Sequence, residues 1–222
     1  MERDQAKGIP HPPWQKPAPE GAPLIDLVAP EDLTVGTMPL IEAIKRRRSR
    51  RKYGPEPLSQ EELSFLLWAT QGVQGVREGS VATLRTVPSA GARHPFETYL
   101  LVHQVVGLEP GLYRYLALDH KLCFLRPGAD LEVPDGWFLH HCAVVFVWTV
   151  IPYRTEWRYS VLSHKHIALD AGHVCQNLYL ACEAIGAGTC AIGAYDQADM
   201  DALVEVDGVE EFTIYVAPVG KV

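Results

Sequence analysis

The stretch HKHIALDAGHVCQNLYLACEAI, residues 164–185, carries the longest helical pattern in the sequence. Apolar side chains recur along it at helical spacing and form one stripe: Ile167, Ala171, Val174, Leu178, Ala181 and Ile185. Gly186 follows the stripe and ends the helix. Asp170, His173 and Asn177 share the opposite face, where they either line a site or satisfy one another at a contact with another helix.

Several apolar runs around this helix predict a sheet. Ala143–Val150 is continuously apolar, which is typical of a buried central strand. Leu24–Val28 predicts either a short strand or a docking segment. Four more runs are rich in β-favouring residues and predict further strands: Phe96–Val106, Gly111–Leu118, Lys121–Leu125 and Phe212–Ala217.

Two shorter helices precede most of these strands. Thr37 is placed to cap a helix over Met38–Arg47, with an apolar face formed by Leu40, Ile41 and Ile44. The Ser59–Glu62 segment is a capping box that opens a second helix, which Gly72 closes. Residues 73–84 predict a mobile loop. The predicted order of elements is two helices, several strands, the long helix and a last strand. This order indicates an α+β fold, a mixed sheet flanked by helices.

Length and composition fit one domain preceded by an arm. The chain has 222 residues, of which 47% are apolar and 21% charged, so it can bury a sizeable core. Residues 1–36 are rich in proline, which fixes φ and lacks the N–H group, and they predict an extended N-terminal arm. Residues 37–222 are expected to form the domain.

Charge and cysteine content limit the possible partners and compartment. The net charge of −7 argues against binding of the whole molecule to nucleic acid or to an anionic membrane. No apolar run approaches the length of a membrane span, and the N-terminus lacks the apolar core of a secretion signal. The five cysteines are odd in number and contain no CxxC pair, so we expect reduced thiols in a cytoplasmic protein.

A basic run interrupts this acidic sequence. Six of the seven residues from Arg46 to Lys52 are basic, and Ser49 is the exception. Guanidinium groups together with a hydroxyl are suitable partners for a phosphate group. Taken alone, the run fits a phosphate site and a solvated basic turn or nucleic-acid patch equally well.

Two small-residue segments are further candidates for ligand contact. Arg85–Ala92 and Gly186–Asp196 each contain glycine and alanine, which let the backbone approach a flat ligand closely, but each also fits an ordinary connection. The glycines at 186 and 188 follow a helix, so they do not form a dinucleotide-binding fingerprint. His166, His173 and Cys175 do not share one helix face, and we expect no metal site.

Six segments, in this order along the chain, together resemble the nitroreductase superfamily and, within it, the SagB-type dehydrogenase branch. The resemblance runs from about Met38 to Val219. It rests on Arg47–Arg51, Pro57–Gly72, Arg85–Gly91, Pro110–Tyr115, Leu169–Leu180, and Gly193–Asp196 with Asp207-Gly208.

The resemblance implies an FMN-dependent oxidoreductase that forms a homodimer with flavin sites at the subunit interface. It assigns the flavin phosphate and ribityl chain to Arg47, Arg48, Ser49 and Arg51. It places a second segment, usually from the other subunit, against the ring: Pro88, Ser89, Ala90 and Gly91. It brings a third segment towards the ring's N5 and O4 atoms: Ile192, Gly193 and Ala194. Lys221 is the basic residue near the C-terminus that could help with the phosphate.

The implied activity is ping-pong hydride transfer from NADH or NADPH to a small acceptor such as a nitroaromatic or a quinone. An alternative is a SagB-like azoline dehydrogenase acting on a peptide or small heterocycle, with Tyr159 handling the proton. Azoline-forming members carry a Lys-Tyr pair before the long helix, whereas this chain has Arg158-Tyr159, and an arginine cannot act as a base. A third hypothesis is a non-catalytic flavin-binding or basic-patch module. Arg93-His94 also departs from the branch and alters the polarity of the pocket.

Overall fold

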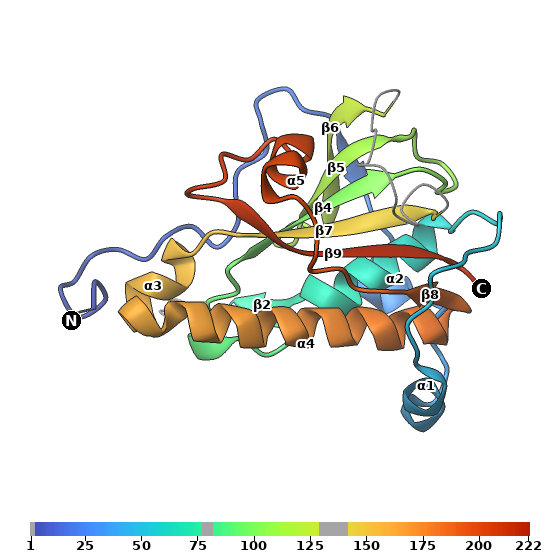
Figure 1. The fold of residues 1–222 in the computed structure, drawn as a ribbon, viewed down its shortest axis with the longest axis horizontal. Coiled ribbons are helices and arrows are strands. Elements are labelled where there is room, and N and C mark those ends of the chain that lie inside the picture. The colour runs from blue at the N-terminus through green and yellow to red at the C-terminus, as the bar shows by residue number, and fades with distance from the viewer. Residues whose placement is uncertain (1–2, 77–81, 129–141) are drawn as a thin grey trace.

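An antiparallel sheet forms the centre of the computed structural model, which describes residues 3–76, 82–128 and 142–222 (Figure 1). Seven strands follow one another across this sheet in the order β1-β6-β5-β4-β7-β9-β8, and every neighbouring pair is antiparallel. Their bounds are β1 Leu24–Asp26, β4 Phe96–Val102, β5 Gly111–Leu116, β6 Lys121–Pro127, β7 Val144–Val150, β8 Ala187–Thr189 and β9 Phe212–Lys221.

Helices cover both faces of the sheet, which confirms the predicted α+β architecture. The helices α2 (Gln60–Gln71) and α4 (Ser163–Ala184) pack on one face, and α5 (Gln197–Leu203) packs on the other (Figure 1). The β7 strand is buried along its whole length, as its continuous apolar run predicted. On α4, the predicted stripe from Ile167 to Ala181 lies in the larger core.

The start of α2 shows the predicted capping box. Ser59 Oγ accepts a hydrogen bond from the Glu62 backbone N–H at 3.1 Å, and a Glu62 carboxylate oxygen accepts one from the Ser59 N–H at 2.9 Å. The helix ends where Gly72 begins an extended segment. This local sequence signal therefore places the element that packs against α4.

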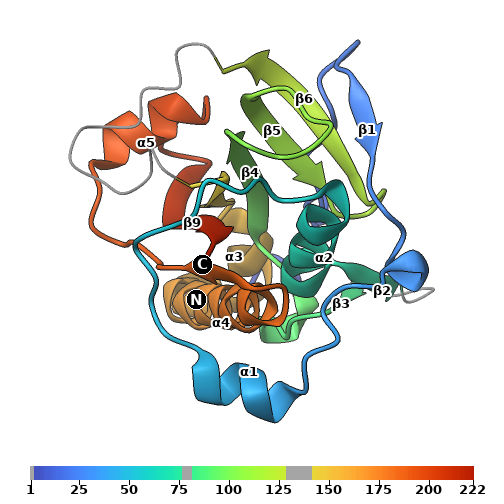
Figure 2. The ribbon, with the colours of Figure 1, turned by 90° about the vertical axis from the view of Figure 1, so that its right-hand side faces the viewer.

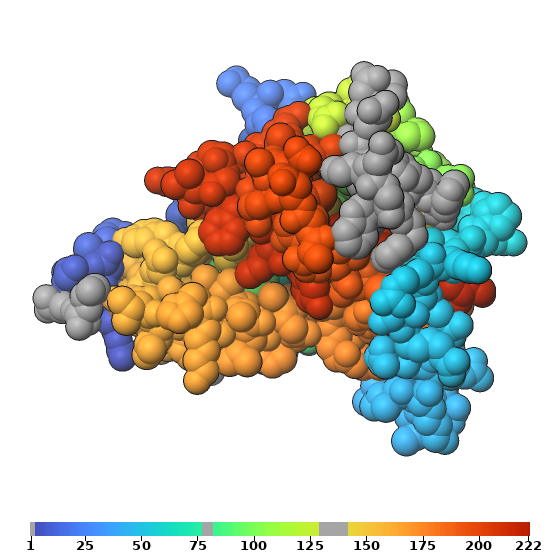
Figure 3. All heavy atoms as spheres, viewed as in Figure 1, coloured from blue at the N-terminus to red at the C-terminus, as the bar shows by residue number. Residues whose placement is uncertain are grey.

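The first helix differs from its prediction. Helix α1 spans Leu40–Arg46, follows Pro39 and receives no cap from Thr37. Its predicted apolar face points to solvent, because Leu40, Ile41 and Ile44 are 64%, 60% and 55% exposed, whereas Ala43 is buried. The helix lies against α4 and projects from the body of the molecule (Figures 2 and 3). The predicted cap from Thr37 was therefore wrong, and the helix begins two residues later than predicted.

The connection after α2 contains a hairpin, so the expectation of a loop over residues 73–84 was wrong. Strands β2 (Val73–Val76) and β3 (Thr83–Arg85) pair antiparallel with a register shift between Val73 and Gly75. The part of this segment from 77 to 81 lies outside the described residues. Helices α3 (Tyr153–Tyr159) and α5 and strand β8 were not predicted, and three short 3₁₀ turns cover Pro30–Asp32, Ala90–Ala92 and Ser160–Leu162.

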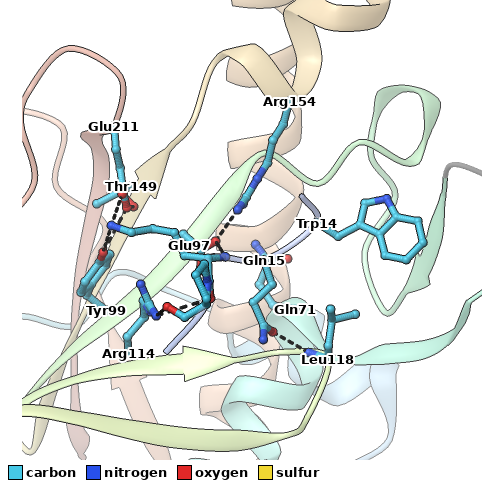
Figure 4. A network of polar contacts seen from close by, with 12 residues as sticks. Trp14, Gln15, Gln71, Glu97, Tyr99, Arg114, Leu118, Thr149, Arg154 and Glu211 are labelled. Carbon is cyan, nitrogen blue, oxygen red and sulfur yellow. Dashed lines mark hydrogen bonds and ion pairs between the residues drawn. The ribbon is translucent and has the colours of Figure 1, made fainter. Parts of the chain in front are cut away.

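The N-terminal segment packs on the domain through residues 4–17. The Trp157 indole N–H donates to the Ile9 carbonyl at 2.8 Å, and the His11 and Trp14 rings stack with centroids 5.0 Å apart. Lys16 reaches the buried Glu211, and its backbone N–H donates to Glu97 at 2.8 Å. Glu97 in turn pairs with the buried Arg154 at 2.5 Å (Figure 4). The segment therefore completes a network of buried charges.

No helix in the described part of the chain is both long and apolar enough to cross a membrane.

Candidate functional site

Tyr179 on α4 joins two of the three predicted ligand-contact segments. Its hydroxyl lies 3.1 Å from Ser49 Oγ and accepts a hydrogen bond from the Ala191 backbone N–H at 2.9 Å. The guanidinium carbon of Arg47 lies 5.4 Å from the centre of the tyrosine ring. A backbone hydrogen bond from Arg50 N–H to the Thr189 carbonyl, 2.9 Å long, holds the same two segments together. Residues 47–50 and 189–191 therefore lie side by side.

Gly188 permits this close approach. The Arg50 side chain packs over it, and a Cβ built at residue 188 would lie 2.4 Å from Arg50 Cγ. Arg50 then turns to the buried Glu183, with 3.7 Å between the charged groups. Any side chain at 188 would push this arginine away, so glycine is required by packing.

The other arginines of the basic run lack an acidic partner. Among the described residues, Arg47, Arg48 and Arg51 form no ion pair, and the side chains of Arg48 and Arg51 are exposed. Together with Ser49 they place three cations and one hydroxyl at the end of α1. This donor set can neutralise and hydrogen-bond a phosphate.

The 192–194 segment follows directly on Thr189 and Ala191, which contact Arg50 and Tyr179. Ile192 is buried and exchanges backbone hydrogen bonds of 2.7 and 3.2 Å with Val216. Gly193 and Ala194 follow it and are exposed. A Cβ built at Gly193 would meet nothing within 4 Å, so the space beside this backbone is open.

Asp170 holds the third predicted segment. Its carboxylate accepts hydrogen bonds from Ser89 Oγ at 2.6 Å and from the Ala90 N–H at 3.1 and 3.2 Å. Burial raises the pKa of Asp170, while the hydrogen bonds from Ser89 and Ala90 act in the opposite direction. The buried carboxylate thus fixes the 88–91 segment on α4, while Pro88 itself is exposed.

Gly91 brings this segment against α3. Its φ is +60°, and a Cβ there would lie 2.7 Å from Tyr159 Oη and 2.8 Å from Arg158 Cδ. Both the left-handed backbone and the crowded surroundings require glycine. The Tyr159 ring also packs against His166 on α4, with ring centres 4.4 Å apart. The predicted catalytic Tyr159 therefore touches the predicted ring-contacting segment.

The two halves of the candidate site lie on opposite sides of one helix. Asp170 and Tyr179 are nine residues apart on α4, which corresponds to about 13–14 Å along the axis and half a turn around it. The 88–91 segment is held at Asp170, whereas the 47–51 and 189–194 segments meet at Tyr179. A single chain therefore does not bring all three segments together.

The three polar residues predicted to share one face of α4, Asp170, His173 and Asn177, do not hydrogen-bond to one another in the described structure. Asp170 turns to Ser89 and Ala90, the Asn177 amide donates to the Ala69 carbonyl on α2 at 2.8 Å, and His173 is exposed. Only Asn177 makes the helix–helix contact that the spacing indicated. The anchoring roles of Asp170 and Tyr179 depend on segments distant in sequence, so local pattern alone could not identify them.

Lys221 is already engaged near the end of β9. Its ammonium group pairs with Glu62 and donates to the Ile185 carbonyl at 2.8 Å. Its own carbonyl accepts from the Gly54 N–H at 2.8 Å. In this arrangement it ties the last strand to α2 and to the end of α4.

The cysteines and possible metal ligands show no reactive cluster in the described residues. All five cysteines are buried, and burial raises the pKa of Cys142 and Cys175 to about 12. No three His, Cys, Asp or Glu side chains of the described residues come together as a metal site.

Family comparison agrees with this geometry. The sequence model of the nitroreductase family matches residues 44–221, which include all three ligand-contact segments. The chain belongs to the nitroreductase family. It is 32% identical over 195 residues to the nitroreductase-family protein MJ1384 of Methanocaldococcus jannaschii, covering 83% of this chain and 94% of that protein.

Two further relatives refine the comparison. The crystal structure of a nitroreductase-family protein from Ralstonia eutropha JMP134 superposes with a TM-score of 0.74 at 27% identity, covering 93% of each chain. The trifolitoxin-processing protein TfxB of Rhizobium leguminosarum bv. trifolii is 29% identical over 119 residues, which cover 46% of this chain and 30% of TfxB. The match to TfxB agrees with the SagB-type branch predicted from the sequence.

Proposed function

We propose that this nitroreductase-family oxidoreductase binds FMN and transfers hydride between NADH or NADPH and a small acceptor. One observation carries the proposal: Arg47, Arg48 and Arg51 form no ion pair within the described residues, and the exposed Gly193 and Ala194 follow the 189–191 stretch that meets the basic run. A flavin mononucleotide needs both features, a cationic site for its phosphate and an open, flat surface for its ring.

The residues fit the phosphate end of the cofactor. A phosphate monoester carries nearly two negative charges, and three unneutralised guanidinium groups in a protein of net charge −7 supply the complement. The Ser49 hydroxyl, held by Tyr179, adds a hydrogen-bond donor. Lys221 is left out of this set because Glu62 and the Ile185 carbonyl already take its ammonium group.

The residues also fit the ring end. Because the Ile192 N–H is taken by Val216, the exposed Gly193 and Ala194 are the positions whose backbone can face a ring. Bound FMN supplies two-electron hydride chemistry, so the protein need not supply a catalytic acid. The chain's own task is to bind the ring, exclude water and position the exchanging substrates.

A homodimer would complete the site. Asp170 holds the 88–91 segment about 13–14 Å along α4 and half a turn away from Tyr179, so a second copy must supply one of the two halves to a single ring. The exposed apolar side chains of Leu40, Ile41 and Ile44 offer a surface for such a contact. Beside them lies a largely apolar groove of about 340 Å³ between α1, α2 and α4.

The function therefore follows a ping-pong scheme in which donor and acceptor use the same cleft in turn. The donor is a reduced nicotinamide nucleotide, and the acceptor is a nitroaromatic, a quinone or a similar small molecule. We also propose Tyr159 as the group that handles a substrate proton where one is required, because its hydroxyl lies against Gly91.

The alternative is a SagB-like dehydrogenase acting on a peptide or small heterocycle. The likeness to the trifolitoxin-processing protein favours it. The presence of Arg158 before Tyr159 speaks against a base at that position, because a guanidinium keeps its proton at working pH.

The visible absorption spectrum of freshly purified protein tests the proposal. A flavin spectrum that bleaches on anaerobic addition of NADH or NADPH is the expected result. A flavin spectrum that does not bleach would favour another donor. Protein that is colourless and cannot be loaded with FMN would refute the cofactor proposal.

A double variant tests the phosphate assignment. Arg47→Ala with Arg51→Ala should release FMN without unfolding the chain, because neither arginine forms an ion pair within the described residues. Arg3→Ala with Lys165→Ala removes the same charge from two exposed positions and should retain the flavin. Full retention of flavin by the arginine variant would contradict the assignment.

A further inference from the structure

Two arginines beside the 88–91 segment form no ion pair with a carboxylate of the described residues. Arg158 on α3 touches Gly91 through Cδ and Nε, and Arg93 follows the same segment in sequence. Within the described residues neither side chain forms an ion pair or a hydrogen bond. The surroundings of Gly91 are therefore locally cationic in an acidic protein.

Arg93 is the more unusual of the two. Its side chain is 1% exposed, its guanidinium carbon lies 5.0 Å from the centre of the Trp157 ring, and its Nε and Nη1 atoms are buried without a hydrogen-bond partner. A buried guanidinium normally carries several hydrogen bonds, because its desolvation is costly. Arg93 therefore leaves a positive charge without compensation close to Arg158, and an anion bound at Arg158 from outside the chain would offset it.

The neighbouring charges do not supply that anion. Burial and the cations Arg158 and Arg154 lower the pKa of Arg93, and only the Tyr159 hydroxyl acts in the opposite direction. Arg154 is itself paired with Glu97 at 2.5 Å. Two positive charges thus remain for an external ligand.

We propose that Arg158, backed by Arg93, binds a carboxylate on the substrate that exchanges hydride with the flavin. This inference rests on the proposed function, because it places the carboxylate beside the segment assigned to the ring. Planar guanidinium groups bind carboxylates through paired hydrogen bonds, which fixes orientation as well as adding affinity. The site therefore selects small anionic aromatic or heterocyclic acids over their neutral analogues.

Equilibrium binding tests the proposal without turnover. FMN-loaded protein is titrated with 4-nitrobenzoate and with its neutral analogue 4-nitrobenzamide by calorimetry. We expect the acid to bind on the order of tenfold more tightly, as a charged hydrogen-bonded pair at a partly exposed arginine provides. Arg158→Gln should abolish this preference while leaving the affinity for the amide unchanged, and Arg158→Lys should retain part of it.

Matched variants exclude a general effect of charge. Lys165→Gln removes one positive charge from an exposed position on α4 and should keep the preference. Arg93→Lys keeps the charge but loses the planar guanidinium group. It should weaken binding of 4-nitrobenzoate and leave binding of 4-nitrobenzamide unchanged. Equal affinity of wild-type protein for acid and amide would overturn the proposal.

Rapid mixing separates the substrate from the nicotinamide donor. Dithionite-reduced protein is mixed with each nitro compound, and oxidised protein is mixed with NADH and NADPH. The proposal is supported if Arg158→Gln slows only the oxidation of the reduced flavin by 4-nitrobenzoate. If the variant slows only the reduction of the flavin by NADH and NADPH, the arginines bind phosphates of the donor and the proposal is overturned. Normal flavin reduction and reoxidation with no preference for the acid would leave the proposed function intact and refute this inference alone.

Discussion

Lys16 joins the N-terminal segment to the interior through one buried carboxylate, so its replacement should destabilise the whole fold. Lys16 Nζ lies 2.5 Å from Glu211 Oε2 and 3.1 Å from the Tyr99 hydroxyl. The Glu211 side chain is 8% exposed and also accepts hydrogen bonds from Thr149 and Tyr99. Burial lowers the pKa of Lys16, but the hydrogen bond to Glu211 and the contacts with Tyr99 outweigh this and raise it overall.

The expected cost of Lys16→Met lies between two known limits. Exposed ion pairs contribute about 0.2–1 kcal/mol, whereas removing one partner of a fully buried pair costs about 3–5 kcal/mol. The Lys16 side chain is 37% exposed, and Glu211 would keep two hydrogen bonds to hydroxyl groups. We therefore expect a loss of about 2 kcal/mol, or about 4–8 °C in Tm for a chain of this length.

Urea unfolding followed by tryptophan fluorescence measures this loss. The matched control is Lys45→Met, whose ion pair with Glu42 is largely exposed, and it should cost less than about 0.5 kcal/mol. The double variant Lys16→Met with Glu211→Gln should be more stable than the sum of the two single losses predicts, by about 1 kcal/mol. The reasoning is refuted if Lys16→Met costs no more than Lys45→Met.

Three shorter predictions concern other parts of the molecule. Burial lowers the pKa of His94 to about 3, so the unfolded chain gains a proton below about pH 6.5 that the native protein does not take up. Stability should therefore fall by about 1.4 kcal/mol per unit as the pH falls below that value, and His94→Gln should remove this part of the slope in urea unfolding at pH 5–7. Ser59→Ala should cost about 1 kcal/mol in the same assay, because it removes a helix cap, and an unchanged midpoint would contradict this. Tyr159→Phe should leave NADH oxidation with a generic acceptor nearly unchanged in steady-state kinetics, whereas a large loss would favour the alternative dehydrogenase reaction.

Long periodic segments were predictable because local pattern and tertiary burial agree there. The stripe on α4 faces the core from Ile167 to Ala181 in a helix of 22 residues, and the β7 run is buried along its whole length. The capping box at Ser59 depends on backbone groups three residues apart, so it needs no distant partner. These features fixed the α+β class without knowledge of the fold.

Periodicity shows which residues share a face, but it does not show what covers that face. Helix α1 is amphipathic as expected, yet Leu40, Ile41 and Ile44 point outwards in the single chain. Strands β2 and β3 were missed because Gly75 interrupts a short run and the register shifts beside it. Helix α5 carried a readable signal, since the Asp196 side chain accepts from the Asp199 N–H at 3.0 Å.

The candidate site shows the same division between local and tertiary information. Residues 47–51, 88–91 and 192–194 could be nominated from composition and resemblance, because small and basic residues cluster locally. The pairing of Ser49 with Tyr179, and of Ser89 with Asp170, joins residues more than 80 positions apart in the chain. No local pattern encodes such a contact, so the anchors emerged only from the fold.

The partners of the arginines separate structural from functional cations. Arg85, Arg114 and Arg154 are buried and each has a protein partner, respectively Gln71, the Pro17 carbonyl and Glu97. The arginines without acidic partners discussed above lie instead in the basic run after α1 and beside Gly91. A buried arginine with protein partners recovers its desolvation cost within the chain, whereas the exposed Arg48 and Arg51 stay hydrated and available to a ligand. Both clusters coincide with segments that the sequence nominated for ligand contact, so charge pairing in the fold and residue type in the sequence independently indicate the same segments.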